Sequence, residues 1–126
     1  MADEITITAN LAATKEGVQV ESWPTTTYAE DWTDEDFVDR TQTIGTTEEL
    51  IDIPAEVATL GWAIFYNLDT TNYVQLFTLT GSVYTAFARI PPQAPCGPVY
   101  LAMGRTALYA KANSSSCNIR YRILRA

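Results

Sequence analysis

The sequence of 126 residues contains no histidine and only two cysteines, Cys96 and Cys117. Without histidine there is no Ser-His-Asp or Cys-His nucleophile, no histidine general base and none of the usual zinc or iron sites. Two cysteines are too few for a disulfide framework or a four-cysteine metal site. An enzyme built from this chain would have to work through carboxylates.

The two cysteines have two interpretations. In a reducing cytoplasm we expect two buried thiols, and we favour this interpretation. The alternative is one disulfide that forms late. If residues 98–103, 106–112 and 117–125 form an up-down-up meander, the cysteines fall at the same end of it, about 10 Å apart across two strands. A disulfide then requires that the first strand leave the sheet.

Long apolar runs and glycine motifs are also missing. No apolar run approaches the ~20 residues of a membrane helix, and the start Met1-Ala2-Asp3-Glu4 has neither the basic nor the apolar part of a signal peptide. We therefore expect a soluble protein without a signal peptide and without membrane contact. The six glycines are scattered singly, so nucleotide phosphate chemistry is not expected.

Negative charge is absent from the second part of the chain. All fifteen acidic residues lie between Asp3 and Asp69, and residues 70–126 hold six of the eight cations, so the formal charges are 2 − 15 = −13 and +6. Either the two parts fold over each other and cancel the field, or an acidic pole and a basic pole attract other copies or a larger partner. The net charge of −7 disfavours nucleic acid as a partner.

The apolar residues that are present follow the pattern of β-strands. Residues 4–9 and 17–23 alternate with period two, which places Ile5, Ile7, Val18 and Val20 on an inner face. Residues 60–68, which include Trp62, are nearly all apolar and predict a core strand covered on both faces. The predicted strands are residues 4–9, 17–23, 60–68, 72–79, 83–90, 98–103, 106–112 and 117–125.

About 8 to 10 short strands separated by turn residues predict an all-β fold with little helix. The expected architecture is an antiparallel β-sandwich of jelly-roll-like or immunoglobulin-like type. The length predicts a single domain over residues 1–126. Residues 24–36, which are rich in threonine and acidic residues, are expected to form a long loop or arm.

An acidic group lies in and after this segment, with the members Glu30, Asp31, Asp34, Glu35, Asp36 and Asp39. Carboxylates of this kind are suited to acid–base catalysis or to calcium. The segment lacks the glycine and the Asp-x-Asp-x-Asn spacing of a calcium loop, so we expect no metal and no cofactor. Pairing with a basic neighbour is the favoured function for it.

A basic strip is predicted near the C-terminus. Arg120 and Arg122 alternate with apolar residues, and Arg125 extends the strip. The strand is either an exposed edge whose charges discourage pairing, or a strip that meets an acidic surface of a neighbouring subunit, such as its residues 30–39. No aromatic stacking motif accompanies the arginines, so nucleic acid is not expected.

Large aromatic residues flank or lie within the acidic segment. Trp23, Tyr28 and Trp32 either fold back onto the sandwich or anchor in a partner, as interface hot spots do. The predicted interface consists of Trp23, Tyr28, Asp31, Trp32, Asp34, Glu35, Asp36, Arg120, Arg122 and Arg125.

Residues 61–74 read Gly-Trp-Ala-Ile-Phe-Tyr-Asn-Leu-Asp-Thr-Thr-Asn-Tyr-Val, preceded by Thr-Ile-Gly-Thr at 43–46 and followed by Phe-Ala-Arg at 87–89. Together these segments resemble small all-β structural proteins of tailed bacteriophages, over residues 41–125. The resemblance carries no catalytic residue. It implies a non-enzymatic virion protein, most simply a capsid decoration (cement) protein or head-fibre base, made in the host cytoplasm. On this basis we expect a homotrimer that binds the major capsid protein at the capsid surface.

Two alternatives are left open by the sequence. The first is a phage tail or baseplate subunit, which the same resemblance covers. The second is a carbohydrate-binding β-sandwich that displays aromatic residues, among them Trp32, to sugars.

Overall fold

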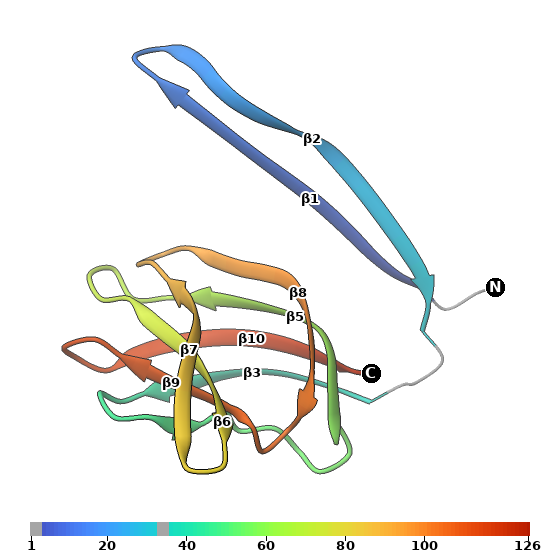
Figure 1. Cartoon of the computed structure of the whole chain (residues 1–126), viewed down its shortest axis with the longest axis vertical. Coiled ribbons are helices and arrows are strands. Elements are labelled where there is room, and N and C mark those ends of the chain that lie inside the picture. The colour runs from blue at the N-terminus through green and yellow to red at the C-terminus, as the bar shows by residue number, and fades with distance from the viewer. Residues whose placement is uncertain (1–3, 33–35) are drawn as a thin grey trace. The chain divides into compact units, whose positions relative to one another are not determined.

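Ten β-strands and no helix make up the described part of the chain in this computed structural model (Figure 1). The structure describes the backbone of residues 4–32 and 36–126, and their side chains except those of residues 4, 14, 15 and 18–24. The predicted all-β class is confirmed. The chain divides into two compact units, Met1–Asp34 and Glu35–Ala126, whereas we expected one domain.

The first unit is a two-stranded antiparallel ribbon of β1 (Glu4–Lys15) and β2 (Val18–Asp31). Glu16 and Gly17 connect the strands with φ values of 52° and 78°. A two-residue turn with both φ values positive follows the natural twist of a hairpin. Both strands are longer than the alternating segments 4–9 and 17–23 that the sequence predicted.

Residues 24–31 belong to β2, which corrects the loop that we expected over residues 24–36. The threonines of this segment are β-branched and suit a strand, and Thr27 pairs with Thr8 of β1. Pro24 lies where the register shifts between Ala9 and Leu11, and such bulges tolerate the missing N–H of proline. The sequence pattern was misleading because a proline and a run of polar residues look like a loop.

The second unit is a sandwich of two four-stranded antiparallel sheets. Sheet I contains, in spatial order, β3 (Phe37–Ile44), β10 (Cys117–Arg125), β5 (Thr59–Asn67) and β8 (Pro95–Gly104). Sheet II contains β4 (Glu49–Leu50), β9 (Leu108–Ala112), β6 (Val74–Thr80) and β7 (Val83–Ile90). The sandwich architecture is confirmed for this unit.

The core lies between the two sheets of the sandwich. Each strand turns alternate side chains inward, as the period of two requires. Fully buried side chains come from both sheets and from the β4–β5 connection, and they include Ile44, Ile51, Leu60, Phe65, Leu76, Ile90, Leu108, Ile119, Tyr121 and Ile123. Burying each such side chain stabilises the fold by roughly 1.5–3 kcal/mol. The sandwich therefore has a core of its own.

The last three strands do not form one meander. β8 and β10 belong to sheet I, but β9 between them crosses to sheet II. β5 separates β8 from β10, so Cys96 and Cys117 lie on strands that are about 10 Å apart. Both cysteines are free thiols, as favoured, and burial raises the pKa of each. Cys117 is buried, whereas Cys96 is half-buried.

Candidate binding surface

Strand β10 carries the alternation that the sequence predicted. Ile119, Tyr121 and Ile123 are buried, whereas Arg120 and Arg122 between them are exposed. β10 pairs with β3 on one side and β5 on the other, so it is not the exposed edge strand of our first interpretation. Its arginines lie on the outer face of sheet I, where they cannot serve to block edge pairing.

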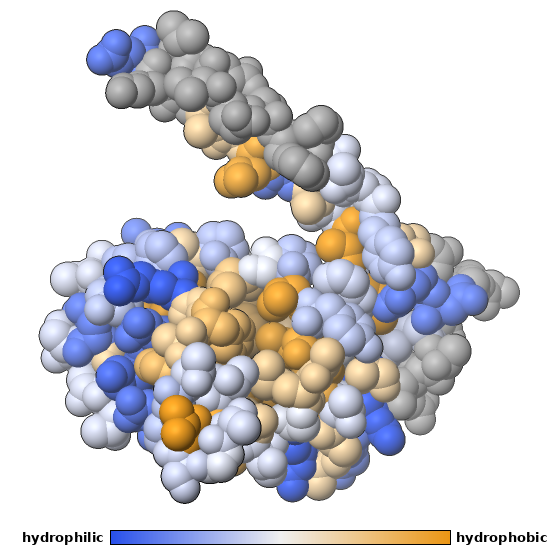
Figure 2. Space-filling view, viewed as in Figure 1, coloured by the Kyte–Doolittle hydropathy of each residue, from blue (hydrophilic) through white to orange (hydrophobic). Residues whose placement is uncertain are grey.

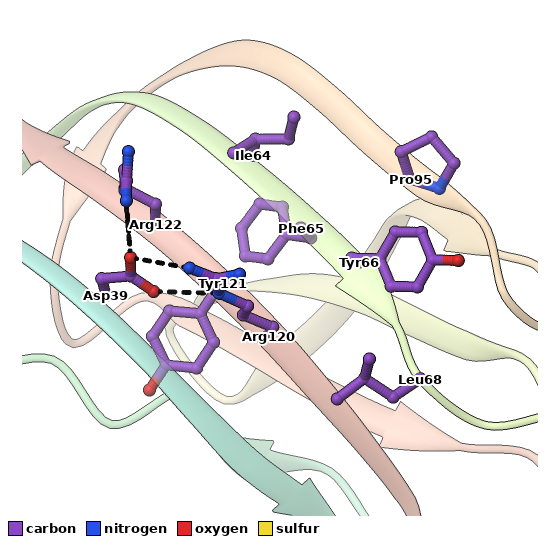
Figure 3. A pocket seen from close by; sticks show the side chains of 9 residues that line it. All are labelled: Asp39, Ile64, Phe65, Tyr66, Leu68, Pro95, Arg120, Tyr121 and Arg122. Atoms are coloured by element: carbon purple, nitrogen blue, oxygen red, sulfur yellow. Dashed lines mark hydrogen bonds and ion pairs between the residues drawn. The ribbon is translucent and has the colours of Figure 1, made fainter.

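Both arginines bind the carboxylate of Asp39 on β3 (Figure 3). Arg122 donates from Nε and Nη2 to Oδ2 at 3.2 and 2.7 Å. Arg120 donates from Nε to Oδ1 at 3.3 Å and from Nη2 to Oδ2 at 3.2 Å. The hydrogen bonds from Arg120 and then Arg122 hold the pKa of Asp39 below its usual value.

The cluster of Asp39, Arg120 and Arg122 keeps a formal charge of +1. The arginine side chains are 60% and 56% exposed, whereas that of Asp39 is only 22% exposed. A guanidinium has more N–H donors than the two that each arginine directs at Asp39. The surface therefore retains positive charge and donors that a carboxylate of a partner can use.

Apolar side chains lie next to these arginines. Ile64, Tyr66 and Leu68 are 42%, 40% and 46% exposed. In the ladder between β5 and β10, Ile64 is opposite Arg122 and Tyr66 is opposite Arg120. These residues line a shallow hollow of about 510 Å³. We call Asp39, Ile64, Tyr66, Leu68, Arg120 and Arg122 the sheet I surface.

These exposures correct our interpretation of residues 60–68 as a strand covered on both faces. Leu60 and Phe65 face the core, but Ile64 and Tyr66 face outward. β5 is an interior strand, yet a sandwich of two sheets leaves each sheet one outer face. β-branched and aromatic residues suit either face, so the sequence pattern could not separate them.

Trp62 is not part of the buried core, where we had placed it. It is half-buried and meets Tyr100 of β8 edge to face, with 5.4 Å between ring centroids and 83° between ring planes. Tyr100 is opposite Trp62 in the ladder and is 47% exposed. This aromatic pair extends the apolar part of the outer face toward β8.

The acidic residues 30–39 do not form one group in the structure. Asp36 accepts a hydrogen bond from Nη1 of Arg125 at 3.1 Å, and Asp39 binds the other two arginines. These aspartates bind the basic strip within one chain, whereas the predicted contact was with the acidic surface of a neighbouring subunit. Asp34 and Glu35 lie outside the described residues.

The predicted aromatic anchors belong to the first unit. Tyr28 is 51% exposed, and its hydroxyl donates to Oε2 of Glu30 at 2.8 Å, which is the main reason for its raised pKa. Trp32 is half-buried. Trp23 is opposite Leu11 in the ribbon, and its side chain lies outside the described ones. The structure thus brings Arg120 and Arg122 together with Asp39, but places the aromatic residues on another unit.

The charge asymmetry divides at the unit boundary. Residues 1–34 contain seven acidic residues and one lysine, 1 − 7 = −6, whereas residues 35–126 contain eight acidic and seven basic residues, 7 − 8 = −1. In the sandwich, β3 from the acidic part of the sequence pairs with β10 from the basic part. The two parts thus fold over each other within the sandwich, and most of the acidic excess belongs to the ribbon unit.

The described residues were compared with the requirements of a metal site and of a membrane-spanning helix. Over residues 4–32 and 36–126, no three cysteine, aspartate or glutamate side chains gather where they could hold a metal ion. In the same part of the chain there is no helix of the length and apolarity needed to cross a bilayer.

Comparison of the chain with protein-family models, with curated proteins and with solved structures gave no match.

The residues that sequence reasoning missed are Asp39, Ile64, Tyr66 and Leu68. Asp39 was grouped with the acidic segment, and the other three were assigned to a buried strand. One signal was present: Tyr66 carries a polar hydroxyl, which usually needs a partner when it is buried. In the structure, that hydroxyl donates to the carbonyl oxygen of Gln93 at 3.1 Å near the surface.

Proposed function

We propose that this chain is a non-enzymatic structural protein of a tailed-bacteriophage virion, a capsid decoration (cement) protein that binds the assembled major capsid protein. The observation that carries the proposal is the ribbon. None of its described side chains is buried, and Leu11 and Tyr28 are 72% and 51% exposed. An isolated two-stranded hairpin is at best marginally stable in water. Exposed apolar and aromatic side chains on a two-stranded ribbon are suited to contact with a partner surface, as in an assembly element.

The sandwich supports the same role with a second surface for contact. Figure 2 shows hydrophobic side chains at the surface of the sandwich and of the ribbon, among hydrophilic ones. A rigid unit with its own core and exposed apolar residues is suited to docking. A virion as the place of this docking is supported by the resemblance of residues 41–125 to phage structural proteins.

The mechanism is stabilisation by addition. A protein that binds the assembled shell better than its separated subunits shifts the equilibrium toward the shell. Each contact can be weak, because an oligomer that touches several capsid subunits gains affinity from its effective concentration. Many copies per particle then hold the shell closed.

The test is co-sedimentation of the purified protein with empty shells of the proposed partner, the major capsid protein. We expect saturable binding to shells, weak binding to separated capsid subunits, and a raised melting temperature of the shell. Residues 35–126 serve as the comparison, because among the described side chains the buried hydrophobic ones lie between Val38 and Ile123, so the sandwich should fold alone. Equal binding to shells and to separated subunits would contradict the proposal.

Copy number separates head from tail. Quantitative mass spectrometry of purified particles should find hundreds of copies of a cement protein, whereas a tail or baseplate subunit is present in far fewer. A low copy number would identify the chain as a tail or baseplate subunit.

A carbohydrate-binding sandwich is the second candidate, because Trp62, Tyr66 and Tyr100 contribute aromatic surface to the outer face of sheet I. Sugars stack on exposed aromatic rings of this kind. Glycan-array binding that is lost in Tyr66→Ala and Tyr100→Ala, and retained in Tyr28→Ala, would favour it. No binding to any glycan removes this candidate.

A further inference from the structure

The sheet I surface suits a partner that is both apolar and acidic. Four of its six residues form a two-by-two grid on neighbouring strands, with Ile64 opposite Arg122 and Tyr66 opposite Arg120. Within each strand the two positions are two residues apart, a step of about 6.6–6.8 Å. One column of the grid is apolar and the other is positively charged, with Asp39 beside it.

One end of the ribbon carries the complementary grid. Ile5 is opposite Glu30, and Ile7 is opposite Tyr28. Directly opposite residues share a face of an antiparallel pair, and so do residues two apart in one strand. These four side chains therefore lie on one face, at the same two-residue step, and combine apolar surface with a carboxylate.

Charge selects this end of the ribbon among the acidic segments. Asp36 and Asp39 bind arginines of their own sandwich, whereas Glu30 accepts a hydrogen bond from Tyr28 beside it. Glu30 and Asp31 belong to the unit with a formal charge of 1 − 7 = −6, whereas the sheet I cluster keeps a charge of +1. Two ribbons repel each other, so a ribbon is attracted to the arginine surface and not to another ribbon.

We infer that the sheet I surface binds the ribbon of a second copy of this chain, through Ile5, Ile7, Tyr28 and Glu30. The inference rests on the proposed role as an assembly protein and adds the contact by which copies join. Each chain gives one ribbon and receives one. Such a head-to-tail contact closes into a ring when the rotation between copies allows it. A ring of three copies would be the homotrimer that the resemblance implies.

The first test is the mass of the full chain in solution, measured by light scattering and by sedimentation velocity over a wide range of concentrations. We expect a closed oligomer in the wild type. Ile64→Asp should raise the dissociation constant at least tenfold, because it places a carboxylate against Glu30 and removes apolar contact. The matched control is Val83→Asp on β7 of sheet II, where the wild-type side chain is 64% exposed. The control should keep the wild-type mass.

Charge exchange tests the partner. Arg122→Glu and Glu30→Arg should each weaken association, and the chain that carries both changes should recover most of it. If either single change acted by misfolding the chain, the double variant would be misfolded too, because it carries both changes. Recovered association would therefore show that the single changes act through their charge. Circular dichroism melts of all variants check that the sandwich is folded.

Three results would overturn the inference. The first is a wild-type chain that is a monomer at every concentration. The second is an oligomer that survives Ile64→Asp and is lost in Val83→Asp, which identifies β7 as the contact. The third is charge exchange that alters the melting temperature of a monomer, which places the ribbon on a surface of its own chain. Capsid binding by such a monomer would leave the proposed function standing.

Discussion

Arg122 and Asp39 face each other across β10 and β3, with Nη2 of the arginine 2.7 Å from Oδ2 of the aspartate. The aspartate comes from the acidic part of the sequence and the arginine from the part without any acidic residue. Antiparallel pairing of the two strands thus cancels opposite charges inside one sandwich. Arg120 binds the same carboxylate, so one negative charge balances two positive charges and the surface stays basic.

We expect Asp39→Asn to lower the melting temperature by a few degrees at neutral pH, because two arginines lose their shared counter-charge. The pKa of Asp39 is depressed in the folded protein. Its stabilising contribution is therefore present above the unfolded-state pKa of about 3.9 and is lost as the pH falls through the lower folded-state value.

Thermal melts of wild type and Asp39→Asn at a series of pH values check this prediction. The difference between the two proteins should shrink below about pH 4. Asp31→Asn is the control, since Asp31 is an exposed residue of the ribbon. A difference that is constant from pH 7 to strongly acid pH would contradict the assignment.

Asn67→Leu should destabilise the sandwich by about 3 kcal/mol. Asn67 is completely buried, and its Nδ2 donates to the carbonyl oxygens of Asn72 at 2.8 Å and of Ile90 and Pro91 at 3.2 Å. Leucine would leave these buried carbonyl oxygens without that donor. Urea unfolding measures the loss, and Asn118→Leu on the outer face of β10 should cost less than about 1 kcal/mol.

Gly97→Ala should cost more than Gly81→Ala in the same unfolding experiment. Both glycines have positive φ, +103° and +63°, so both substitutions carry backbone strain of about 1–3 kcal/mol. A Cβ at Gly97 would also lie 2.7 Å from the carbonyl oxygen of Ala63, whereas nothing lies within 4 Å at Gly81. Equal losses would show that β8 can move away from β5 at no cost.

Tyr121→Phe should lower the free energy of unfolding by about 1–2 kcal/mol at neutral pH. The hydroxyl of Tyr121 donates to the carbonyl oxygen of Asp52 at 2.6 Å and lies 3.1 Å from Oε1 of Gln42. Burial raises the pKa of Tyr121 to about 12. A raised pKa means that its contribution is complete below the unfolded value of about 10 and is lost as the pH rises toward 12.

Two measurements follow for Tyr121. Absorbance titration at alkaline pH should show a tyrosine step near pH 12, and this step should be missing in Tyr121→Phe. Wild-type stability should fall more steeply than that of the variant between about pH 10 and 12. Ionisation of all tyrosines in a single step near pH 10 would argue against the buried position.

Much of the sandwich was readable from the sequence, because strand alternation is a local property. The pattern Ile119-Arg120-Tyr121-Arg122-Ile123 predicted both the strand and its two faces. The ribbon was predicted only at the N-terminal parts of its strands. Pro24 and the threonines after it resemble a loop until β1 is available to pair with them.

The candidate surface was half predicted. Arg120 and Arg122 were identified, but their pairing with Asp39 of the same chain was not, since 81 and 83 residues separate them in the chain. Ile64 and Tyr66 were assigned to the core because a nearly continuous apolar run is typical of a doubly covered strand. Their exposure depends on which strands lie beside and above β5.

By itself, the sequence determined the all-β class, the two faces of β10 and the lack of histidine chemistry. These properties follow from composition and from a period of two, which act over a few residues. Only the tertiary structure decided that β10 is an interior strand, that Asp39 binds its arginines, and that most of the acidic excess belongs to a separate ribbon. Which strands lie side by side depends on contacts between residues that are far apart in the sequence. A pattern over a few consecutive residues does not contain that information.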